Sequence, residues 1–141
     1  MGLRITADTA TFRVGAFGAA VLVRAHGSRA EELDGALRRA WRRCEMDAAC
    51  PAPFGETQLD VCVDPDQGAL AAAVRTGMLA APDVATAMDQ LSSSITVALV
   101  TRRAGSLLML HACGLADPDT GATVALVAPS GTGKSTLART L

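Results

Sequence analysis

The chain has 141 residues, of which 50% are hydrophobic and 19% charged, and its formal net charge is −1. This length suits one ordinary domain, and the hydrophobic content argues against disorder. The balanced charge gives no general attraction to nucleic acid or to an anionic membrane, and no apolar run is long enough to span a bilayer. We therefore expect neither of these as a partner.

The cysteines and the N-terminus favour a cytoplasmic protein. No signal-peptide layout precedes the first predicted strand. The four cysteines show no CxxC spacing, which argues against zinc ligands, and they are too sparse for a disulfide scaffold. We expect reduced, mostly buried thiols.

The first part of the chain alternates predicted strands and helices. Residues Thr11–Arg24 indicate one or two strands interrupted by glycine. Ser28 and Glu31 form a capping-box pattern, which predicts a helix that continues to about Cys44. The expected buried stripe of this helix consists of Leu33, Leu37, Trp41 and Cys44.

The pattern continues with a strand and two helices. Residues Thr57–Val63 alternate as a half-buried strand does, with Leu59, Val61 and Val63 on one face and Gln58, Asp60 and Cys62 on the other. A short helix is predicted over 68–80. A longer one is predicted over Pro82–Arg103, with Pro82 in its first turn. Its expected apolar stripe is Val84, Met88, Leu91, Ile95 and Leu99.

The character of the chain changes after Gly105. The sequence SLLMLHACGLA (106–116) predicts a strand, DPDTGA a turn, and TVALVA a second, fully apolar strand. A tight connection puts Ala116 opposite roughly Thr123, and His111 opposite Val127 or Ala128. We therefore expect an α/β protein with an N-terminal α/β region over 1–105. From 106 a nucleotide-binding P-loop core begins, which the chain leaves unfinished.

A phosphate-binding motif follows the second strand. APSGTGKS (128–135) matches the Walker A pattern, with alanine at the first glycine position. Glycine lets the backbone curl around phosphate oxygens, lysine reaches the β- and γ-phosphates, and the Ser135 hydroxyl can bind Mg²⁺. Lys134 is also the only lysine among thirteen basic residues, which favours a site that needs a compact ammonium. ATP and Mg²⁺ are the expected ligands. The expected nucleotide-binding residues are Ser130, Gly131, Thr132, Gly133, Lys134, Ser135 and Thr136.

His111 is the second candidate for chemistry, together with Lys134. Near the mouth of the loop, a histidine could act as a base or hold a phosphate. A structural histidine, hydrogen-bonded within the sheet, is an equally open interpretation.

The stretch Leu107–Leu141 resembles the opening of the catalytic domain of HPr kinase/phosphorylase and its relatives, whose core is similar to ATP-dependent phosphoenolpyruvate carboxykinase. In these families a strand with a histidine leads through a turn into the P-loop, and here His111 precedes Lys134 by 23 residues. The resemblance implies that Lys134 contacts phosphates, Ser135 the metal, and that His111 is an active-site residue. Thr136 stands where HPr kinases usually have glutamate, which leaves the acceptor open.

The resemblance implies the ATP-binding part of a serine/threonine kinase that transfers the γ-phosphate of ATP to a protein or peptide hydroxyl, with Mg²⁺. The acid that holds Mg²⁺ and the base for the acceptor are expected beyond residue 141, so we expect a truncated chain that is inactive alone. A transporter-type P-loop ATPase and a non-catalytic nucleotide-binding regulatory module remain alternatives. A homo-oligomer also remains open.

Overall fold

The computed structural model describes residues 9–108, 110 and 112–140. These residues form a mixed α/β structure with four helices, and the chain divides into two compact units after Ala104. None of the helices within the described ranges is long and apolar enough to cross a membrane.

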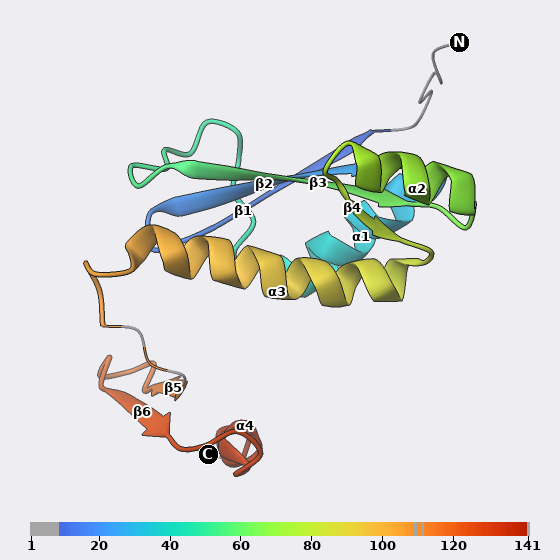
Figure 1. The fold of residues 1–141 in the computed structure, drawn as a ribbon. Helices are drawn as coiled ribbons and strands as arrows, with labels where there is room; N and C mark the ends of the chain where they lie inside the picture. Colours follow the sequence, from blue (N-terminus) through green and yellow to red (C-terminus); the bar gives the residue numbers. More distant parts are fainter. Residues whose placement is uncertain (1–8, 109, 111, 141) are drawn as a thin grey trace. The chain divides into compact units, whose positions relative to one another are not determined.

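The first unit contains a mixed four-stranded sheet in the order β1-β2-β3-β4 (Figure 1). β1 and β2 pair antiparallel, whereas β2–β3 and β3–β4 pair parallel. The strands are β1 (Ala10–Ala16), β2 (Ala19–His26), β3 (Glu56–Val63) and β4 (Leu79–Ala81).

A two-residue turn joins β1 to β2, which confirms the predicted interruption by glycine. Phe17 and Gly18 both have positive φ, 56° and 76°. Such a pair matches the type I′ turns that suit the twist of a hairpin, at the cost of strain at the phenylalanine.

Helices α1 (Ala30–Trp41) and α3 (Val84–Arg103) pack on one face of the sheet, and α2 (Gln67–Arg75) contacts β3 and β4 from the other side (Figure 1). The stripe predicted for the longest helix is confirmed, because Leu91, Ile95 and Leu99 are buried and Val84 and Met88 are partly buried against the hydrophobic core. The sheet supplies the facing side chains of this core: Phe12, Val14, Val21, Val23, Val61 and Val63.

The predicted start and end of α1 are wrong. The helix begins after Arg29 and has no side-chain cap. The Ser28 N–H, which a capping box would donate to Glu31, donates instead to Asp64 Oδ2 at 3.0 Å. The helix ends at Trp41 because the following segment pairs with β1. There the Gly15 N–H donates to the Cys44 carbonyl at 2.8 Å. Tertiary hydrogen bonds decide both boundaries.

The helix predicted over 68–80 is too long. It ends at Arg75, Gly77 follows with φ 82°, and Leu79–Ala81 pairs with β3 as β4. Pro82 is not in the first turn of α3, because Asp83 is the N-cap and accepts from the Thr86 N–H at 2.8 Å.

The expectation of mostly buried thiols is also wrong. Of the four free cysteines only Cys62 is buried, and Cys50 is exposed. Cys62 was predicted on the solvent-facing side of a half-buried strand β3. It is buried there because α2 covers that side of the sheet near the end of β3 (Figure 1). Burial raises the pKa of its thiol, and Asp64 adds to the effect.

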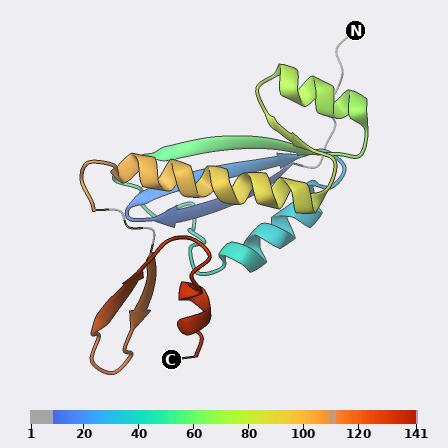
Figure 2. The same ribbon diagram turned by 60° about the horizontal axis from the view of Figure 1, so that its bottom comes forward.

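The second unit consists of the hairpin β5 (Ala112–Ala116) and β6 (Thr123–Val127), followed by α4 (Lys134–Leu137; Figure 2). The predicted register is confirmed, because Ala116 pairs with Thr123. Among the described residues the first strand begins at Ala112, not at 106. None of the described residues of this unit is buried, and Val124 and Val127 are 57% and 62% exposed.

Candidate functional site

The candidate site is the loop between β6 and α4, residues 128–133, together with the first residues of α4. Gly131 and Gly133 have φ of 81° and 83°, whereas no other described residue of the loop has positive φ. A Cβ at either glycine would meet nothing within 4 Å, so the backbone conformation, not crowding, requires glycine there. The loop therefore alternates between ordinary and left-handed backbone.

This alternation leaves a run of main-chain donors free. In the part of the chain that the structure describes, the N–H groups of residues 131–135 donate no hydrogen bond to another chain atom. Successive free N–H groups in alternating left- and right-handed backbone form the anion-binding concavity known as a nest. The arrangement can bind phosphate oxygens.

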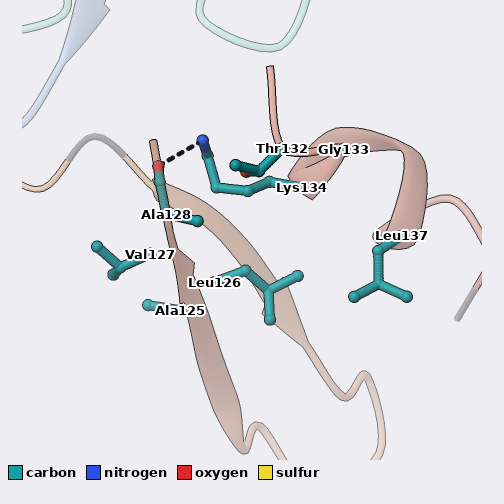
Figure 3. A pocket seen from close by; sticks show the side chains of 8 residues that line it. All are labelled: Ala125, Leu126, Val127, Ala128, Thr132, Gly133, Lys134 and Leu137. Atoms are coloured by element: carbon teal, nitrogen blue, oxygen red, sulfur yellow. Dashed lines mark hydrogen bonds between the residues drawn. The ribbon is translucent and has the colours of Figure 1, made fainter. Parts of the chain in front are cut away.

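The side chain of Lys134 reaches back to the end of β6 (Figure 3). Its Nζ donates to the carbonyl of Ala128 at 2.7 Å and to that of Pro129 at 2.8 Å. An ammonium group has three N–H donors, so two fix its position and one remains for a ligand.

The loop also borders a hollow of about 410 Å³. Figure 3 shows Leu126 of β6 pointing toward Leu137 of α4, whereas Ala125 and Val127 point to the other side of the strand. The apolar side chains of this hollow can contact an apolar group, whereas the free N–H groups and the ammonium can bind an anion. Its lining residues are Ala125, Leu126, Val127, Ala128, Thr132, Gly133, Lys134 and Leu137.

The remaining predicted site residues differ in which groups are available to bind a phosphate or a metal ion. Ser130 and Ser135 are exposed, and neither hydroxyl is engaged within the described residues, so the oxygen of Ser135 is available to a metal. The Thr136 N–H donates to the Gly133 carbonyl at 3.0 Å and is not available to a phosphate. Within the described ranges, no group of three or more His, Cys, Asp or Glu side chains could hold a metal ion.

His111 lies outside the described residues, so its role stays a prediction. Its neighbour Ala112 pairs with Val127, the last residue of β6.

Two features of the site were not predicted from the sequence. The Thr132 hydroxyl donates to the Pro129 carbonyl at 2.9 Å, and Lys134 binds main-chain carbonyls of its own loop. The sequence predicted Thr132 as a nucleotide-binding residue and specified no role for its hydroxyl. No signal in the motif specifies the partner of this hydroxyl, because a hydroxyl rotates to whichever acceptor the fold brings near.

Comparisons with models of known protein families, with curated proteins and with solved structures found no match. The function of the loop is therefore inferred from the residues of this chain and from their geometry.

Proposed function

We propose that residues 130–135 bind the phosphate groups of ATP, and that the chain is the ATP-binding part of an HPr-kinase-like serine/threonine kinase. The observation that carries the proposal is the run of free N–H groups over 131–135, beside the only lysine of the chain. Amide donors and an ammonium group are what the acceptor oxygens of a triphosphate require.

The distribution of charge in the second unit favours an anionic ligand. Its described carboxylates, Asp117 and Asp119, lie in the turn at the far end of the hairpin. The four residue steps of β6 span about 13 Å, which exceeds the Debye length at physiological ionic strength. No described carboxylate of this unit therefore offsets the ammonium of Lys134.

The free groups of the site match the parts of a phosphoryl-transfer centre. The ammonium of Lys134 would contact the β- and γ-phosphates, the Ser135 hydroxyl would ligate Mg²⁺, and His111 would act as a base or hold a phosphate. Mg²⁺ would neutralise charge on the phosphates when bound. The kinase assignment depends on the resemblance around His111, and the acceptor would be a protein or peptide hydroxyl.

The proposal is tested by calorimetric titration of the chain with ATP, ADP and AMP in the presence of Mg²⁺. We expect ATP and ADP to bind and AMP to bind at least about tenfold more weakly, because a P-loop lysine contacts the β- and γ-phosphates. Lys134→Ala should weaken ATP binding about 10- to 100-fold, the range for a hydrogen bond to a charged group.

Arg139→Ala is the matched control, since it removes an equal charge on the surface five residues further along. It should leave ATP affinity within about twofold. An unchanged affinity in Lys134→Ala would refute the phosphate role. If ATP also perturbs the NMR signals of the His111 ring but not those of His26, the kinase-like placement gains support. An unperturbed His111 favours one of the alternative P-loop classes.

A further inference from the structure

The carbonyl of Pro129 accepts two hydrogen bonds from side chains of the same loop. It accepts from Thr132 Oγ1 at 2.9 Å and from Lys134 Nζ at 2.8 Å. A carbonyl oxygen has two lone pairs, so these two donors saturate it. Thr132 and Lys134 flank Gly133, and Thr132 itself stands between the two glycines with positive φ. The Pro129 carbonyl, at the start of the loop, is thus hydrogen-bonded both to Thr132 in its middle and to Lys134 at its end.

We propose that Thr132 is a positioning residue, whose hydroxyl holds the loop in its phosphate-binding shape before a ligand arrives. The inference rests on the proposed function of the loop. A hydroxyl has one hydrogen, and that of Thr132 is donated to Pro129. Since phosphate oxygens accept hydrogen bonds, a hydroxyl engaged in this way acts on the loop and not on the phosphate.

The effect is one of preorganisation. Glycine samples positive and negative φ about equally, so a loop with two such residues has many conformations in which its N–H groups diverge. Ordering it on binding reduces affinity. The hydroxyl of Thr132 restricts both glycines at once, because it fixes the residue between them.

The variants Thr132→Val and Thr132→Ser separate the hydroxyl from the rest of the side chain. Valine keeps the branched shape and removes the donor, whereas serine keeps the donor. Thr140→Val is the matched control, because Thr140 Oγ1 also donates to a carbonyl three residues earlier, that of Leu137, at 2.8 Å and outside the loop.

Two measurements are made on each variant: the affinity for Mg²⁺–ATP and for inorganic triphosphate, and the ¹⁵N order parameters of Gly131 and Gly133 in the free chain. We expect Thr132→Val to bind both ligands about three- to tenfold more weakly, the range for one neutral hydrogen bond, and to lower both order parameters. Thr132→Ser and Thr140→Val should match the wild type.

The two measurements must change together. If Thr132→Val binds more weakly but keeps its order parameters, the Thr132 hydroxyl contacts the ligand. If it lowers the order parameters but keeps its affinity, binding does not require a preordered loop. Either result overturns the proposal. If the wild-type chain binds neither ligand, the proposed function fails. In that case the order parameters alone test whether the Thr132 hydroxyl orders the loop, and unchanged values in Thr132→Val overturn that role.

Discussion

Asp60 uses both oxygens of its carboxylate. Oδ1 accepts from His26 Nε2 at 3.2 Å and Oδ2 from Gln58 Nε2 at 2.7 Å, and Arg24 stands directly opposite in the β2–β3 register. Burial alone would raise the pKa of this carboxyl, but the two hydrogen bonds and the neighbouring guanidinium outweigh it, so the pKa is lowered. The ionised form is therefore the one that the folded sheet stabilises.

This lowered pKa predicts a loss of stability in acid. Ionised Asp60 stabilises the fold above its unfolded pKa of about 4, and the contribution disappears as the pH falls through the lower folded value. Asp60→Asn should therefore show a smaller drop in unfolding free energy between about pH 5 and pH 2.5 than the wild type. Urea unfolding followed by the fluorescence of Trp41, the only tryptophan, measures the drop.

Asp89→Asn, at an exposed position of α3, is the control and should keep the wild-type drop. An identical drop in Asp60→Asn and the wild type would show that the hydrogen bonds of Asp60 do not depend on its charge.

At the scale of elements, α3 illustrates how position decides the contribution of an aliphatic side chain. Ile95 is 0% exposed and lies one turn from Leu91 and from Leu99 within the core. Val97, two residues further along, is 63% exposed. The two residues share helix and chemistry and differ in environment.

Ile95→Ala should therefore reduce the unfolding free energy by about 2–5 kcal/mol, since it leaves a cavity in the core. Val97→Ala should change it by no more than about 0.5 kcal/mol. Urea unfolding of both variants provides the comparison. Equal effects would contradict the assigned core face of α3.

The elements also show which parts of the fold the sequence encodes locally. The stripe of α3 and the register of β5–β6 were predictable, because periodicity and a short turn specify them. The start of α1 was not predictable, because the Ser28 N–H donates a hydrogen bond to Asp64, which lies 36 residues away in the sequence. β4 was missed because three residues are too few to show a period, and only its pairing with β3 defines it.

The candidate site divides in the same way. The loop was predicted because its glycines and lysine follow from the chemistry of phosphate binding at a fixed spacing. The bonds of Thr132 and Lys134 to Pro129 were not, since they depend on how the loop closes in three dimensions.

At the scale of the whole molecule, the described core residues belong to one unit. The core cluster extends from Phe12 to Leu99, and no described residue after Ala104 is buried. Packing therefore stabilises the first unit, whereas local hydrogen bonds hold the second.

A chain shortened to residues 1–104 should therefore unfold in urea at the same midpoint as the whole chain, within error, because no described core contact is lost. In the whole chain, amides of β5 and β6 should exchange with deuterium much faster than those of β2. A markedly lower midpoint after shortening, or slow exchange in β6, would contradict the independence of the first unit.

The hairpin has a practical consequence as well. From Ala122 to Gly133 the sequence contains no charged residue, and none of the described residues pairs with the outer edge of β6. An uncovered apolar edge strand without a charged gatekeeper is a template for intermolecular sheet formation. The segment that leads into the candidate loop is thus also an aggregation hazard, and the solubility of the chain should fall wherever β6 is left uncovered.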